Sequence, residues 1–93
     1  MIDAIVNNTA MHRYELPIAD GAAAVAYYAE KDGRIELRHT EVPSEYGGQG
    51  IGTRLAHAVF ETLRAEGRRV IATCPFMAAY AARNPLYAAM LDG

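Results

Sequence analysis

A glycine-rich run, Tyr46–Thr53, is the first stretch of the chain whose residue types could do chemistry. It has four glycines within six positions and leads directly into a segment with helical periodicity. Glycine permits positive φ and a close approach to a ligand, and the first N–H groups of a helix have no acceptor within it. These groups also lie at the positive end of the helix dipole. The run therefore predicts a site for a phosphate or a pyrophosphate.

Two common phosphate-binding loops are excluded by residue type. A Walker P-loop needs a lysine directly after its last glycine, whereas Lys31 is the only lysine of this chain. A dinucleotide fingerprint needs the spacing G-x-G-x-x-G, whereas the glycines from Gly48 onward follow G-x-G-x-G. What remains is a strand-to-helix loop with the spacing G-x-G-x-G.

One cysteine lies at a position where its thiol could be reactive. Cys74 precedes Pro75, and proline is favoured at the first position of a helix. The dipole of a helix that begins there favours a thiolate. Free cysteines are, however, among the most buried residues, so simple packing is the alternative.

Three strands are predicted before the glycine run, over residues 11–16, 22–30 and 34–42. Pro17 places the first strand at or near an edge of the sheet. The second is apolar on both faces, which predicts a central strand covered on both sides. Asp32-Gly33 indicates a tight hairpin turn before the third strand.

The third strand leads into the glycine run. Because side chains alternate along a strand, its residues can be assigned to the two faces of the sheet. Ile35, Leu37 and His39 fall on one face, while Thr40 falls on the other. A histidine on an otherwise apolar face is commonly a hydrogen-bonded core residue. Alternation therefore favours a structural role for His39.

A long helix and shorter elements are predicted after the glycine run. The helix has one apolar face and ends near Gly67. A strand–helix–strand crossover makes the next strand, over residues 70–72, parallel to the third, so Cys74 lies at the same end of the sheet as the glycine run. The helix face consists of Ile51, Leu55, Ala56, Ala58, Val59 and Leu63, and the later elements are a helix over 75–83 and a turn or short helix over 86–91.

The motifs together resemble the GNAT superfamily of N-acetyltransferases, and within it the small stand-alone GNAT-like proteins. The resemblance extends over nearly the whole chain. Two positions depart from the usual pattern, because Gly47 stands where Arg or Gln is common and Asn84 where the small family commonly has His. The segments that carry the resemblance are Val6-Asn7-Asn8, His12–Leu16, His39–Pro43, Gly48–Gly52, Cys74-Pro75-Phe76, Tyr80 and Pro85-Leu86-Tyr87.

The resemblance implies a compact α/β (α+β) fold with a mixed, mainly antiparallel sheet of four or five strands. It also implies a site for acetyl-CoA or CoA, in which the backbone near Val42 and Pro43 pairs with the pantetheine arm and the glycine run binds the pyrophosphate. The expected function is acetyl transfer to an unidentified amine on a small molecule or protein. The expected cofactor-binding residues are Val42, Gly47, Gly48, Gln49, Gly50, Ile51, Gly52 and Thr53.

Such a transfer needs acid and base groups beside the thioester. Glu41 or His39 could take the proton of the amine, and Tyr80 could return a proton to the departing thiolate. Cys74 could accept the acetyl group or merely lie beside it, and Tyr80 could be only an aromatic at the core edge. The alternatives to an enzyme are a non-catalytic module that binds or senses acyl-CoA and, less favoured, a protein-interaction domain.

Length and composition predict one domain, residues 1–93, with an ordinary globular composition that is 52% hydrophobic. No apolar stretch approaches a membrane span, and the start lacks the layout of a secretory signal, so we expect a cytoplasmic protein. One cysteine and three dispersed histidines indicate neither a disulfide nor a metal site. The net charge of −2, with scattered basic residues, argues against a nucleic-acid partner.

Overall fold

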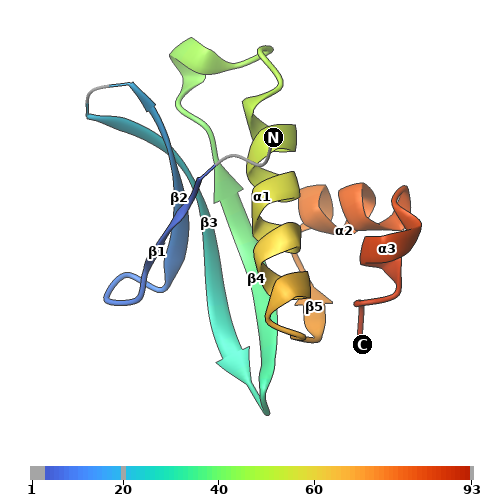
Figure 1. Cartoon of the computed structure of the whole chain (residues 1–93). Coiled ribbons are helices and arrows are strands. Elements are labelled where there is room, and N and C mark those ends of the chain that lie inside the picture. The colour runs from blue at the N-terminus through green and yellow to red at the C-terminus, as the bar shows by residue number, and fades with distance from the viewer. Residues whose placement is uncertain (1–3, 20, 93) are drawn as a thin grey trace.

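Five strands form one mixed sheet in the computed structural model, which describes residues 4–19 and 21–92 (Figure 1). The strands neighbour one another in chain order, and every pair is antiparallel except β4 and β5, which are parallel. The predicted mixed, mainly antiparallel sheet is thus confirmed. The bounds are β1 (Val6–Asn8), β2 (Arg13–Ala19), β3 (Ala22–Lys31), β4 (Arg34–Glu41) and β5 (Val70–Ala72).

The predicted long helix and the short helices near the C-terminus are also present (Figure 1). A single 3₁₀ turn, η1, precedes the glycine run. Gly67 has a φ of 69° and ends the long helix, as expected from its sequence position. The bounds are η1 (Ser44–Tyr46), α1 (Ile51–Ala65), α2 (Pro75–Ala82) and α3 (Pro85–Ala88).

The face of α1 that is buried is wider than the sequence pattern predicts. All six predicted apolar positions are buried, and so is Phe60, which the pattern did not assign to that face. The Phe60 ring stacks on Tyr80 of α2 and Tyr87 of α3, with centroids 6.0 and 5.3 Å away. Helix α1 therefore packs against the sheet along one side and against α2 and α3 along another.

β3 is central, as predicted, but α1 packs against it on one face alone. Ala24, Ala26 and Tyr28 of β3 are buried on the side of the core. On the opposite face Val25 is buried but Tyr27 is only partly buried, so the prediction of full cover on both faces is wrong. The guanidinium of Arg13 covers part of that face, with its Cζ atom 5.6 Å from the centroid of the Tyr27 ring.

β2 is longer than predicted and has an outer neighbour. It continues through Pro17 to Ala19, with an irregular register between these two residues. β1 was not predicted as a strand and pairs with residues 13–15 of β2 alone. Pro17 therefore lies beyond β1, where β2 forms the edge of the sheet and a missing N–H costs nothing.

A β-bulge in β4 overturns the predicted faces of its second half. Tyr28 pairs with Leu37, but the next pair joins Tyr27 to His39, so Arg38 is an extra residue. One extra residue inverts the alternation that follows. His39 therefore leaves the core face and its side chain is 61% exposed, whereas Thr40 turns toward Cys74. The assignment of His39 as a core residue is wrong.

Candidate functional site

The glycine run has the backbone geometry of an anion-binding loop. Gly48 and Gly50 have φ values of 78° and 75°, in the left-handed region that glycine adopts without strain. Gly50 is the residue before α1 and provides no side-chain cap, and Arg54 donates its N–H to the Gly50 carbonyl. The N–H groups of residues 51–53 precede that first helical bond, so they can bind an anion. Residues 47–50 are exposed.

The predicted cofactor residues at the start of α1 differ in what their side chains do. Ile51 is 4% exposed and its side chain belongs to the core, so only its N–H can reach a ligand. Thr53 is exposed. At Gly52, a Cβ atom would lie 3.1 Å from the Phe76 ring of α2. Gly52 therefore also permits close packing of the α1 and α2 starts.

An open stretch of β4 leads into this loop. β5 pairs only with residues 35–37, and the N–H groups of Thr73 and Cys74 both bond to the Leu37 carbonyl. The chain then turns into α2. Within residues 4–19 and 21–92, no backbone hydrogen bond joins residues 38–42 to β5 or α2. This stretch includes Val42 and can pair with an extended ligand.

Cys74 is the N-cap residue directly before α2, and it is 4% exposed. Its sulfur lies 3.8 Å from the hydroxyl oxygen of Thr40. The bulge places Thr40 on this side of β4, so the contact depends on it. The structure thus places the thiol beside the open part of β4, as expected, but largely shielded from solvent.

Tyr80 forms an aromatic cluster with Phe60 and Tyr87 rather than lying at a solvated edge. Its ring stacks on Phe60 and on Tyr87, and the residue is 9% exposed. Burial raises the pKa of Tyr80, and the nearby carboxylate of Glu61 raises it further. The raised pKa keeps the Tyr80 hydroxyl protonated at neutral pH, but it also makes this hydroxyl a weaker acid than that of a free tyrosine.

The carboxylate of Glu61 lies beside these aromatic rings, at the Tyr87 hydroxyl. Its carboxylate accepts hydrogen bonds from Arg64 and from the Tyr87 hydroxyl, and these lower the pKa of Glu61 to about 2. Burial raises the pKa of Tyr87. The Glu61 side chain is only 15% exposed, and its bond to Tyr87 ties α1 to α3.

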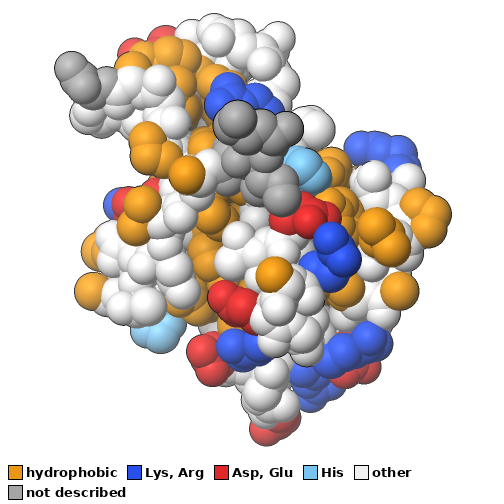
Figure 2. Space-filling view, viewed as in Figure 1, with side chains coloured by type: hydrophobic (Ala, Val, Ile, Leu, Met, Phe, Trp, Pro, Cys, Tyr) orange, Lys and Arg blue, Asp and Glu red, His pale blue; other side chains and the backbone are white. Residues whose placement is uncertain are grey.

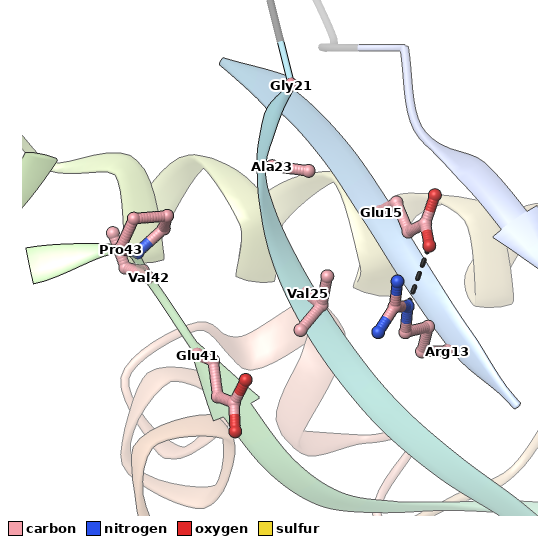
Figure 3. A pocket seen from close by; sticks show the side chains of 8 residues that line it. All are labelled: Arg13, Glu15, Gly21, Ala23, Val25, Glu41, Val42 and Pro43. Carbon is pink, nitrogen blue, oxygen red and sulfur yellow. Dashed lines mark hydrogen bonds and ion pairs between the residues drawn. The ribbon is translucent and has the colours of Figure 1, made fainter. Parts of the chain in front are cut away.

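Glu41 and His39 face the opposite side of the sheet from α1. His39 Nε2 lies 3.1 Å from Glu41 Oε2, and the imidazole stacks on Tyr27. Beside Glu41 lies an open cleft of about 510 Å³ (Figure 3). Its lining residues are Arg13, Glu15, Gly21, Ala23, Val25, Glu41, Val42 and Pro43.

Arg13 and Glu15 are site residues that the sequence did not reveal as such. Arg13 Nε lies 2.7 Å from Glu15 Oε2, and both residues line the cleft (Figure 3). Both residues lie on β2, and nothing in their local sequence indicated that Glu41 lies across the cleft from them. The pairing of β2, β3 and β4 brings these residues together.

Two wider features of the surface bear on partners. No helix among the described residues is long and apolar enough to cross a membrane. Those residues also contain no group of three or more His, Cys, Asp or Glu side chains that could hold a metal. On the face shown in Figure 2, basic side chains lie among acidic ones rather than in one block.

Several known proteins are similar to this chain in sequence or in structure. Protein NATD1 from chicken and from human is 38% identical over 52 residues, which cover 56% of this chain. The chain spans about half the length of these relatives, 47% and 46%. The solution structure of a GCN5-like protein from Staphylococcus aureus matches 99% of this chain and 90% of its own, with a TM-score of 0.70 and 26% identity.

The match to a known family covers most of the chain. The sequence model described as GCN5-related N-acetyl-transferase matches residues 13–90, which include the bulged strand, the glycine loop and the two C-terminal helices. The chain therefore belongs to the GCN5-related N-acetyl-transferase family.

Proposed function

We propose that the protein transfers an acetyl group from acetyl-CoA to an amine. The observation that carries this proposal is the continuous path formed by the open edge of β4 and the uncapped glycine loop. An extended pantetheine arm can pair with the backbone around Val42 in the manner of an added strand. The N–H groups from Gly48 to Thr53 then bind the pyrophosphate, because those at the start of α1 have no acceptor within the helix and lie at the positive end of its dipole.

The proposed base and acid lie on different elements, Glu41 on β4 and Tyr80 on α2. Glu41 acts as the general base for the acceptor amine, and His39 beside it holds and passes on a proton. Tyr80 donates the proton that the departing thiolate needs. Cys74 packs beside the thioester, and its low exposure favours direct attack by the amine over a covalent intermediate.

The CoA site is tested by ligand-induced stabilisation. A ligand that binds only the native state adds about 2.7 kcal/mol to the free energy of unfolding at a hundredfold excess over Kd. Gly50→Glu places a negative charge in the loop, so we expect CoA to stabilise the wild type and not this variant in thermal unfolding.

Gly67→Glu is the matched control. Gly67 has a similar φ of 69° at the other end of α1, and a Cβ atom meets nothing within 4 Å at either glycine. Both variants carry the same backbone strain and charge. An equal response of both variants to CoA would refute the assignment of the glycine loop.

Transfer itself is tested by CoA release from acetyl-CoA across a panel of amines. A general acid or base contributes roughly 10² to 10⁴ in rate, so Glu41→Gln and Tyr80→Phe should each lower the amine-dependent rate by at least about a hundredfold. Cys74→Ala should retain transfer, and intact mass should show no acetyl adduct on the wild type. A hydroxylamine-labile adduct, with transfer lost in Cys74→Ala, would establish the covalent route. Tight CoA binding without amine-dependent release would favour the binding-module alternative.

A further inference from the structure

The cleft opposite α1 has two carboxylates separated by an apolar floor. Glu15 pairs across the sheet with Val25, and Val25 pairs with Glu41, so the three residues form one row over β2, β3 and β4. Neighbouring strands lie about 4.8 Å apart, which places the two glutamate backbones about 10 Å apart. Val25 lies between them, and Ala23 follows on the same face of β3 (Figure 3).

The charge on the Glu15 side of the cleft is held in place. Glu15 Oε2 accepts hydrogen bonds from Asn8 and Arg13, which lower the pKa of Glu15. Among the described residues, no donor reaches its second oxygen, Oε1. Arg13 also donates to the Tyr27 hydroxyl at 3.0 Å. One carboxylate oxygen therefore remains available at this end of the cleft.

The charge on the Glu41 side is less compensated. Its carboxylate contacts His39, and the side chain is 59% exposed. Arg13 balances one of the two carboxylates, so the described lining carries one net negative charge when His39 is neutral. A ligand that fits this lining brings an ammonium to Glu41 and an alkyl chain over Val25 and Ala23.

We propose that this cleft is the acceptor site and that it takes an unbranched alkylamine whose far end is cationic or neutral. A carboxylate at the far end lies near Glu15 and is rejected. The assignment of this cleft as an acceptor site rests on the proposed acetyl transfer. The binding of the amine itself depends only on the residues that line the cleft. Such an amine occurs both as a small diamine and as the side chain of lysine in a peptide.

Three amines with the same chain length test the far-end preference. They are 1,4-diaminobutane, n-butylamine and 4-aminobutyrate, whose far ends are cationic, neutral and anionic. Binding is measured by NMR titration of the backbone amides of Ala23, Val25 and Val42, with and without CoA. Exposed ion pairs contribute modestly, so we expect 1,4-diaminobutane to bind about five- to tenfold more tightly than 4-aminobutyrate, with n-butylamine between them. Equal or tighter binding of 4-aminobutyrate would overturn the proposal.

Some charge variants are expected to raise the affinity for the amines and others to lower it. This contrast separates altered recognition from loss of structure. Glu15→Gln should remove most of the preference for the diamine, and Glu41→Gln should weaken all three amines. Arg13→Gln makes the lining more negative, so it should tighten diamine binding by about threefold. Glu36→Gln, on β4 before the bulge and outside the cleft lining, is the control and should change none of these values. Weaker diamine binding in Arg13→Gln would overturn the charge argument.

Two further arms identify the source of the amine and separate this inference from the proposed function. Nα-acetyl-lysine-N-methylamide should bind like n-butylamine, because its far end is neutral. Faster acetylation of this compound than of 1,4-diaminobutane would indicate a peptide acceptor, and the reverse a small diamine. If the amine ranking holds while CoA release is absent, acetyl transfer fails and the cleft assignment stands. If transfer occurs but the Ala23, Val25 and Val42 amides do not respond, the cleft assignment is wrong.

Discussion

Glu61 shows how one carboxylate can couple a helix to the segment that packs on it. It lies on α1 but accepts a hydrogen bond from the Tyr87 hydroxyl of α3, and Arg64 provides a second one. These donors lower the pKa of Glu61 to about 2. The interaction is therefore strong only while Glu61 is ionised, and it carries a defined dependence on pH.

Acid titration should reveal this dependence. Between about pH 4.5 and pH 2 the unfolded chain binds a proton at Glu61 that the folded chain does not, so the free energy of unfolding falls as the pH is lowered through this range. In Glu61→Gln this contribution is absent. We expect thermal unfolding to show a variant less stable than the wild type at pH 6, with the difference shrinking toward pH 2. Tyr87→Phe should give an intermediate slope, and parallel curves for all three proteins would contradict the assignment.

At the scale of elements, the bulge in β4 decides which side chains reach the cleft. Without Arg38 as an extra residue, Glu41 and His39 would face α1 and Thr40 would face the cleft. Strict alternation was the correct assumption for residues 34–37 and failed at the next position. Polar residues on both faces gave no local signal for the insertion, so the pattern alone could not place it.

Phe60 links α1 to the two C-terminal helices, and its loss should loosen them selectively. Phe60→Leu keeps an apolar side chain but removes the ring that stacks on Tyr80 and Tyr87, at a cost of about 1 to 2 kcal/mol. We expect amide hydrogen exchange to accelerate in α2 and α3 more than in β2 and β3.

The control is the same substitution at an exposed ring. Phe76 on α2 is 40% exposed, so Phe76→Leu should leave the exchange of α3 close to that of the wild type. Uniform acceleration across the sheet and all helices in Phe60→Leu would show that the core unfolds as one unit, without a separable C-terminal part.

For the whole molecule, local patterns predicted the elements and their order well. The glycines at 48, 50 and 67, the Asp32-Gly33 turn and Pro75 each impose a backbone conformation on their own neighbours, and each lies where expected. The parallel arrangement of β5 followed from the strand–helix–strand crossover that connects it to β4. These inferences needed no knowledge of distant contacts.

The parts that sequence reasoning missed depend on pairing between distant segments. β1 is three residues long and pairs at one edge, which leaves too little periodicity to recognise. The burial of Phe60 depends on α2 and α3, and the cleft depends on the register of three strands. The glycine loop could be found because one short segment supplies it, whereas the cleft had to be assembled in three dimensions.

The open stretch of β4 is also an exposed sheet edge, and exposed edges invite pairing with another copy of the same chain. β4 carries known protections against such aggregation, because the edge is short, bulged at Arg38, and charged at Arg38 and Glu41. A flat strand from a second molecule meets a kink and two charges there, whereas a thin, flexible ligand needs only a few backbone groups. The same irregularity that keeps this edge open to a narrow ligand thus guards the protein against self-association.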